Sequence, residues 1–299
     1  MLKRIALFLL LGVVAWLAYE WITFPNVAKL AEERPDTTAF MERRKSDLRK
    51  QGKKDTLEWR WVPYGRISPN LRRAVLVAED DAFYEHEGVD VKAMRDAFER
   101  NWKRGKVTHG GSTITQQLAK NLYLSPSRNP IRKVREYFIA RSLEKHLSKK
   151  RILEIYLNVV ELGERVYGAE AGARHHFRKS AASLTPSEAA LLAGSLPNPR
   201  VMNPSRPNKR LRDRQRMILS RMRRWGHLIE TQVLTEKKPE AETTATSTTD
   251  TTVTETAPTT DTTATTESAA PTSDTTGTTD TAEEPPTDTA PTETTTSGR

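Results

Sequence analysis

Two stretches of polar residues in this chain have the composition of a group-transfer site. The first is the acidic cluster from Glu79 to Asp81, which ends an apolar-periodic helix. A carboxylate at the end of a helix, at the mouth of a cleft, is a candidate general base. We expect the like charges of Asp80 and Asp81 to raise the pKa of Glu79 and nearby cations to oppose that shift. A solvated helix end is the alternative interpretation.

The second stretch resembles an anion-binding site. Two glycines, Gly110 and Gly111, would let the backbone approach a ligand, and a helix is expected to begin just after them. Backbone amides at a helix N-terminus bind phosphate-like groups well. Hydroxyl and amide side chains that could add donors follow at Ser112, Thr113, Thr115, Gln116 and Gln117.

Four cations follow this stretch within about one helix and a loop: Lys120, Arg128, Arg132 and Lys133. Each alone would be a surface charge, but together they favour recognition of a pyrophosphate, since Arg can bind two phosphate oxygens and Lys adds a point charge. Glu136 lies one helical turn after Arg132, so it is either an ordinary ion-pair partner or a second active-site carboxylate. Hydrolases of glycans also use two carboxylates, and only the cations favour a phosphate-linked substrate.

Five motifs in order resemble those of the peptidoglycan glycosyltransferases of family 51. Two match in full: E-D-x-x-F-x-x-H-x-G at Glu79–Gly88 and G-G-S-T-I-T-Q-Q at Gly110–Gln117. The others are R-K-x-x-E at residues 132–136, K-x-x-I-L-E-x-Y-L-N at 149–158 and a weaker R-x-x-x-I-L at 214–219. The resemblance covers roughly residues 57–225. The segment 161–168 departs from the family pattern at Arg165, which leaves the shape of that loop uncertain.

The resemblance implies a fold and a reaction. The expected fold is mainly α, a lysozyme-like helical domain with two lobes around a cleft. The implied reaction polymerises lipid II into glycan chains, releasing undecaprenyl pyrophosphate with inversion, with Glu79 as base and Glu136 as the second carboxylate. The implied substrate-binding residues are Ser112, Thr113, Gln116, Gln117, Lys120, Arg128, Arg132, Lys133 and Lys149.

The same resemblance bears on cofactors and partners. The sequence contains no dedicated metal site and no cofactor is required, so magnesium or manganese would act by bridging the substrate pyrophosphate. Expected partners are lipid II, the growing lipid-linked chain, membrane lipids and proteins of cell-wall synthesis or division. Phe83, His86 and Gly88 are expected to be structural: a core aromatic, a buried hydrogen-bonding histidine and a helix C-cap. The Ser142-x-x-Lys145 pattern has no companion transpeptidase motifs and is rejected.

The N-terminus predicts a membrane anchor. Lys3 and Arg4 precede an apolar run from Ile5 to Tyr19, long enough with its flanks to span a bilayer of roughly 30 Å. No A-x-A cleavage site follows, so an uncleaved anchor is favoured over a signal peptide. The basic residues before the run predict a cytoplasmic N-terminus with the remaining chain outside. The resemblance implies that this membrane is the bacterial inner membrane.

Charge divides the rest of the chain. Residues 241–299 contain eleven acids and one arginine, so the first 240 residues carry 47 basic and 27 acidic side chains, a net +20. Nucleic acid is not an expected partner, because no recognition motif accompanies this charge. The chain has no cysteine, which excludes disulfides and thiol chemistry. We expect four regions: the anchor at 1–28, a stalk at 29–56, the glycosyltransferase domain at 57–236 and a disordered acidic Thr-rich tail at 237–299.

Periodicity and capping residues predict helices at 69–79, 90–104, 116–124, 131–147, 149–157 and 185–193, with Gly105 and Gly194 as stops. Strand signals are weak, at 58–62 and 159–162, and predict at most a small hairpin. Two other functions stay open: a lysozyme-like lytic hydrolase, and a non-catalytic membrane-anchored scaffold for cell-wall assembly.

Overall fold

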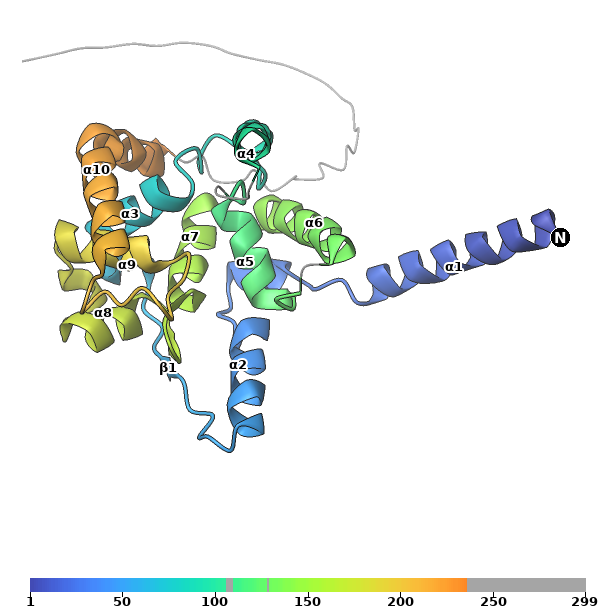
Figure 1. Cartoon of the computed structure of the whole chain (residues 1–299), viewed down its shortest axis with the longest axis horizontal. Coiled ribbons are helices and arrows are strands. Elements are labelled where there is room, and N and C mark those ends of the chain that lie inside the picture. Colours follow the sequence, from blue (N-terminus) through green and yellow to red (C-terminus); the bar gives the residue numbers. More distant parts are fainter. Residues whose placement is uncertain (106–109, 128, 236–299) are drawn as a thin grey trace, which may run out of the picture. The chain divides into compact units, whose positions relative to one another are not determined.

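The computed structural model describes residues 1–105, 110–127 and 129–235, and its helices are drawn in Figure 1. Arg128 and the predicted tail therefore lie outside the described residues. The α-helices are α1 (Leu2–Ile22), α2 (Ala39–Lys50), α3 (Pro69–Glu79), α4 (Val91–Arg104), α5 (Ile114–Tyr123), α6 (Pro130–His146), α7 (Lys149–Val159), α8 (Ala169–Phe177), α9 (Pro186–Ser195) and α10 (Lys209–Thr235). Short 3-10 helices η1 (Ala28–Ala31), η2 (Tyr64–Arg66) and η3 (Ala181–Ser183) and strands β1 (Glu58–Trp59), β2 (Glu161–Gly163) and β3 (Val166–Tyr167) complete the described part. The prediction of a mainly α fold is confirmed.

The helices that carry the predicted site form two groups, which meet in one buried core (Figure 1). In the first, α3 packs on α9 and α10. In the second, α5 packs on α6 and α7, with α2 against α5. The two groups correspond to the two lobes that the sequence predicts.

Local sequence explains why these helices begin where they do. The Ser68 hydroxyl accepts the backbone N–H of Asn70, and Pro69 occupies the first helical position of α3. The predicted capping box of Thr185 and Glu188 is present at α9, and a second one starts α5. These caps satisfy amides that would otherwise lack partners, so each helix start is fixed by its own sequence.

Glycine gives a more mixed result at the helix ends. Gly105 caps α4 in the left-handed conformation, as predicted, with φ 61°. Gly194 does not stop α9, because it lies within the last turn, where a Cβ would come 2.9 Å from Leu211 Cδ1 of α10. Gly88 is likewise not a helix cap: α3 ends at Glu79, and Gly88 has φ 87° in a loop where a Cβ would come 3.1 Å from the Ala140 carbonyl oxygen. Both glycines permit close packing instead.

The small sheet has three strands in the order β1-β3-β2, one more than the predicted hairpin. β2 and β3 pair antiparallel, and β1 adds to β3 in parallel register, with Glu58 opposite Val166. The turn between β2 and β3 contains Arg165 at φ 69°, the position where the sequence departs from the family pattern. A non-glycine residue tolerates this conformation at a cost, and Arg165 is held there by donating to the Thr56 carbonyl at 2.7 and 2.9 Å.

The predicted stalk at 29–56 is wrong. Val27 and Leu30 are buried in the main core, and α2 buries Met41 and Leu48. Arg151 of α7 also donates to the Leu30 carbonyl at 2.8 Å. These contacts make the segment part of the folded domain. We expect replacement of Met41 by alanine to cost about 2–5 kcal/mol of folding stability, the usual range for a buried large side chain.

Helix α1 contains the one stretch in the described residues that is long and apolar enough to cross a membrane. It runs from Lys3 to Ile22 with a mean hydropathy of 2.1, and none of it is buried in the protein. A signal sequence passes the same test of length and composition. An exposed apolar helix of this length is stable in a bilayer, where its backbone polar groups are satisfied internally.

Candidate active site

The candidate base Glu79 lies at the C-terminal end of α3, where its side chain is 14% exposed. One carboxylate oxygen accepts a hydrogen bond from Gln117 Nε2 of α5 at 3.0 Å. The other lies 3.6 Å from Arg214 Nη2 of α10. The two helix groups therefore meet at this carboxylate.

Burial is the main influence on this carboxyl group. It raises the pKa of Glu79 above the ordinary value of 4.5, and the Asp80 charge raises it slightly further. The Gln117 hydrogen bond and the positive charges of Arg214 and Lys120 act in the opposite direction. The direction agrees with the sequence prediction, but the principal cause is desolvation and not the neighbouring acids. A carboxylate with a raised pKa is a stronger base, which suits proton removal.

Gln117 is itself oriented by Tyr156 of α7. The Tyr156 hydroxyl donates to Gln117 Oε1 at 2.9 Å, which leaves the amide nitrogen to face Glu79. Tyr156 is fully buried, and burial raises the pKa of this phenol well above its usual range. The hydroxyl therefore stays protonated and keeps donating. The three side chains form a fixed relay from the core to the candidate base.

Asp80 occupies the helix N-terminus that the sequence assigned to a phosphate. Its carboxylate accepts the backbone N–H of Ile114, the first residue of α5, at 2.8 Å. It also contacts His86 Nε2 at 3.0 Å. His86 Nδ1 accepts the N–H of Gly88 at 3.2 Å, so the proton on Nε2 is the one that faces Asp80. The prediction of a hydrogen-bonding histidine is confirmed, although the residue is only partly buried, with its side chain 9% exposed.

The rest of this N-terminus is also used by the fold. Thr113 and Gln116 form the capping box of α5, and the Thr113 hydroxyl donates to the Gly88 carbonyl at 2.7 Å. Gly111 lacks a side chain because a Cβ would come 3.0 Å from Met94 Cα of α4. Two backbone amides of the predicted anion cradle, those of Ile114 and Gln116, are therefore taken by the protein's own Asp80 and Thr113.

Those side chains gather around Glu136 of α6, which is 2% exposed. Arg132 Nη1 binds one of its oxygens at 2.8 Å, and Lys133 Nζ binds the other. Lys133 also donates to the hydroxyl of Ser112 at 3.1 Å. The Nε of Arg132 is buried without a hydrogen-bond partner among the described residues. Lys133, 44% exposed, thus joins the buried carboxylate to the serine that precedes α5.

Lys120 connects the two carboxylate regions electrostatically. Burial lowers the pKa of its ammonium group, Glu136 and Glu79 raise it, and Arg132 and Lys133 lower it. A cation within reach of both carboxylates and of two other cations is well placed to meet a multiply charged anion. Its nitrogen also lies 5.7 Å from the ring centre of Phe40 on α2.

Lys149 lies in a different environment from the other predicted substrate-binding cations. Its ammonium group binds Glu144 at 2.8 Å and the His86 carbonyl at 2.5 Å, and it lies 4.6 Å from the ring centre of Phe83. Glu144 in turn accepts the Thr115 hydroxyl at 2.6 Å. These contacts hold the loop after α3 against α6 and α7. Lys149 and Thr115 therefore stabilise the backbone around the site.

Sequence reasoning missed two contributors. The sequence marks Arg214 only as part of the weakest motif, yet this residue approaches Glu79 while its Nε donates to the Gly194 carbonyl at 3.0 Å. Tyr156 was quoted only as part of a motif. The motif spacing marked both residues, but only the packing of α7 and α10 against α3 and α5 reveals their contacts.

The described residues contain no group of three or more His, Cys, Asp or Glu side chains arranged to hold a metal ion. Both candidate carboxylates are already matched by protein donors, Glu79 by Gln117 and Glu136 by Arg132 and Lys133.

Comparison with known proteins identifies the family of this chain. The family model described as "Transglycosylase" matches residues 46–223. Three similar proteins bear the name biosynthetic peptidoglycan transglycosylase. The one from Nitrosospira multiformis is 48% identical over 204 residues, 68% of this chain and 89% of the relative. The one from Methylobacillus flagellatus is 47% identical over 72% of this chain and 94% of the relative, and the one from Dechloromonas aromatica 49% identical over 63% and 81%. The chain therefore belongs to the transglycosylase family.

Proposed function

We propose that this protein is a peptidoglycan glycosyltransferase that extends glycan chains from lipid II. The observation that carries the proposal is the pairing, in one site, of a buried carboxylate of raised pKa with a cluster of cations around a second carboxylate. The first feature suits removal of a proton from a sugar hydroxyl. The second suits a leaving group that departs as a pyrophosphate.

In the proposed reaction, Glu79 accepts the proton of the 4-hydroxyl of the acceptor N-acetylglucosamine. The oxygen attacks the anomeric carbon of the donor N-acetylmuramic acid as the bond from that carbon to the pyrophosphate oxygen breaks. One glycosidic bond forms, undecaprenyl pyrophosphate leaves, and the anomeric configuration inverts. Gln117 holds the Glu79 carboxylate in place through the bond described above.

The leaving pyrophosphate would be met by side chains and not by the backbone amides of α5. Lys133 and Ser112 are joined by a hydrogen bond at the exposed edge of the cluster, where a phosphate could replace one of Lys133's partners. Arg132 and Lys120 add charge behind them. Glu136 then acts as a positioning residue that keeps Arg132 and Lys133 together. Magnesium or manganese, if bound with the substrate, would reduce the negative charge of the pyrophosphate.

We further propose that α1 anchors the protein in the bacterial inner membrane, with its N-terminus in the cytoplasm and the catalytic domain outside. Lys3 and Arg4 at the start of the span support this orientation. A lipid-linked substrate would thus reach the enzyme within the membrane. Proteins of cell-wall synthesis or division are expected to recruit it.

The test is a polymerisation assay with labelled lipid II and detergent-solubilised full-length protein, with and without magnesium. We compare the wild type, Glu79→Gln and Asp81→Asn, a matched control that alters an exposed neighbouring acid. Polymer that lysozyme digests should form with the wild type and the control but not with Glu79→Gln. Cleavage of unlinked glycan without any requirement for the pyrophosphate would favour the lytic hydrolase, and binding of lipid II without reaction would favour the scaffold.

A further inference from the structure

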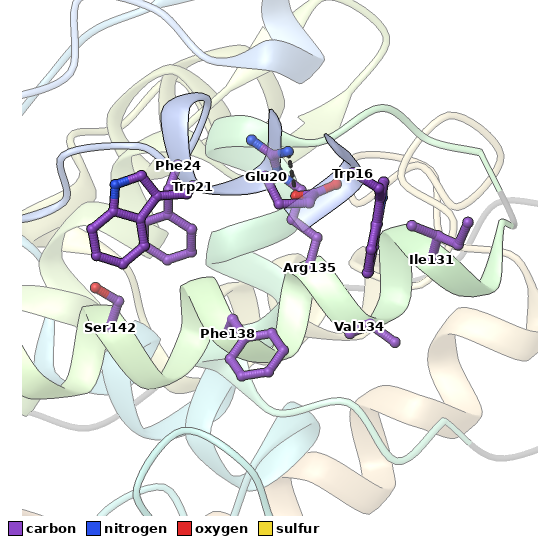
Figure 2. A pocket seen from close by; sticks show the side chains of 9 residues that line it. All are labelled: Trp16, Glu20, Trp21, Phe24, Ile131, Val134, Arg135, Phe138 and Ser142. Atoms are coloured by element: carbon purple, nitrogen blue, oxygen red, sulfur yellow. Dashed lines mark hydrogen bonds and ion pairs between the residues drawn. The ribbon is translucent and has the colours of Figure 1, made fainter. Parts of the chain in front are cut away.

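A largely apolar groove lies between the membrane anchor and helix α6 (Figure 2). Its volume is about 620 Å³. The last turns of α1 and Phe24 form one wall, and one face of α6 forms the other. The lining residues are Trp16, Glu20, Trp21, Phe24, Ile131, Val134, Arg135, Phe138 and Ser142.

Arg135 holds the two walls together. Its guanidinium binds Glu20 at 2.6 Å, the Thr23 hydroxyl at 3.1 Å and the Thr23 carbonyl at 2.5 Å. Figure 2 shows the Arg135 side chain reaching Glu20 across the groove. A cation at the C-terminal end of a helix satisfies its last carbonyl groups and complements its dipole. We call these contacts of Arg135 with Glu20 and Thr23 the Arg135 clamp. The clamp holds the two walls of the groove in place.

The anchor wall places this groove at the edge of the membrane hydrocarbon, where the span meets the membrane surface. The apolar span ends at Ile22, and Trp16 and Trp21 fall within its last turns. Tryptophan is enriched where a span meets the membrane surface. The α6 wall presents Ile131, Val134 and Phe138, which are 49%, 48% and 57% exposed in the protein alone. Such exposure is unfavourable in water but ordinary for a surface that hydrocarbon covers.

We propose that the groove binds one acyl chain of a bilayer phospholipid, wedged between the anchor and the helix that carries Glu136. This rests on the membrane attachment proposed above. The direction of the α6 faces argues against the prenyl chain of the substrate. With about 100° per residue, Ile131, Arg135, Phe138 and Ser142 form one stripe, while Glu136 lies well over 90° away from its centre. A chain leaving the active-site pyrophosphate would emerge on that other face.

The experiment uses full-length protein in nanodiscs of phosphatidylethanolamine and phosphatidylglycerol that contain a phosphatidylethanolamine with a diazirine in its acyl chain. After irradiation and digestion, mass spectrometry locates the adducts. Since any anchor contacts lipid, the informative adducts are those on residues 131–138. The variants are Val134→Trp, which fills the groove, Arg135→Gln, which opens the clamp, and Val201→Trp, which alters an exposed valine outside the groove.

Adducts on residues 131–138 should form in the wild type and in Val201→Trp, and should be lost in Val134→Trp and reduced in Arg135→Gln. Their absence in the wild type, or their persistence in Val134→Trp, would overturn the proposal. So would their displacement by added undecaprenyl pyrophosphate, which would assign the groove to the prenyl chain. A parallel polymerisation assay in the same nanodiscs separates the two proposals, because adducts without polymer would refute only the proposed reaction and polymer without adducts only the groove.

Discussion

The C-terminal end of α3 and the first turns of α6 each hold one candidate carboxylate, and the two environments are opposite. Glu79 has one neutral donor at 3.0 Å and one distant cation at 3.6 Å. Glu136 has two cations in direct contact with its two oxygens. Glu79 is therefore free to accept a proton, whereas Glu136 is committed to holding positive charge in place.

This difference assigns roles that the motifs alone leave open. A carboxylate destabilised by burial lowers its free energy by taking a proton, which is the work of a base. A carboxylate between two cations lowers the free energy of those cations and fixes their positions. They can then bind a phosphate without rearrangement.

The largest effect should follow Glu79→Gln. The amide keeps the shape and can still bond to Gln117 but cannot accept a proton. We expect the rate of polymerisation to fall by roughly 100- to 10,000-fold with little change in lipid II binding, the range typical of a lost general base. Single-turnover assays with labelled lipid II measure the rate. A variant that retained more than a tenth of the wild-type rate would remove Glu79 from the base role.

The second prediction concerns the cation cluster. Lys133→Ala should slow the reaction by about 100-fold, as expected for loss of one charge-stabilising donor. Glu136→Gln should also slow the reaction. It should cost about 2–4 kcal/mol of folding stability, because Arg132 loses its charged partner. The cost is not larger because Lys133, the second partner, is partly exposed to solvent. Assays combined with denaturant unfolding separate the two effects. Arg141→Ala, which breaks the exposed ion pair with Glu87, is the control. An unchanged unfolding midpoint in Glu136→Gln would contradict the positioning role.

Local features of the fold were predictable because each depends on neighbouring residues. Ser68 with Pro69, and Thr185 with Glu188, place their helix starts by sequence alone. The strand Val166–Tyr167 was missed because two residues carry no periodicity, and it exists through pairing with the neighbouring β2 and with the distant β1. The segment at 29–56 was misjudged because Met41 and Leu48, seven positions apart among charges, give too sparse an apolar pattern.

The candidate site was also predictable only in part. The motifs identified Glu79 and the residues that surround it, but not which partners each one has. Asp80 binds the backbone N–H of Ile114, which lies 34 positions away in the sequence. Lys149 binds the His86 carbonyl, which lies 63 positions away. Family motifs mark such residues without distinguishing those that contact a substrate from those that hold the backbone.

The third prediction concerns pH. Because burial raises the pKa of Glu79, the acidic limb of the rate profile should lie above pH 4.5, where an ordinary glutamate would titrate. Removing the Gln117 hydrogen bond removes an influence that lowers this pKa, so Gln117→Ala should move the limb to still higher pH. Tyr156→Phe, which frees the Gln117 amide to rotate, should move it in the same direction by less. A limb that stayed in place in both variants would show that the relay does not tune the base.

The smallest effect is one of stability. A carboxyl whose pKa is raised on folding binds its proton more tightly in the native state than in the unfolded chain. It therefore costs no stability below the unfolded pKa near 4.5, and an increasing amount as pH rises through the folded pKa. Glutamine at position 79 avoids this cost, so Glu79→Gln should melt at a higher temperature than the wild type at pH 7.5, with a difference that vanishes towards pH 4. Glu136→Gln should melt lower, because its carboxylate stabilises Arg132 and Lys133. If the same Glu→Gln change raises the melting temperature at position 79 and lowers it at position 136 at neutral pH, the basicity of Glu79 costs the fold stability, whereas the charge of Glu136 stabilises it.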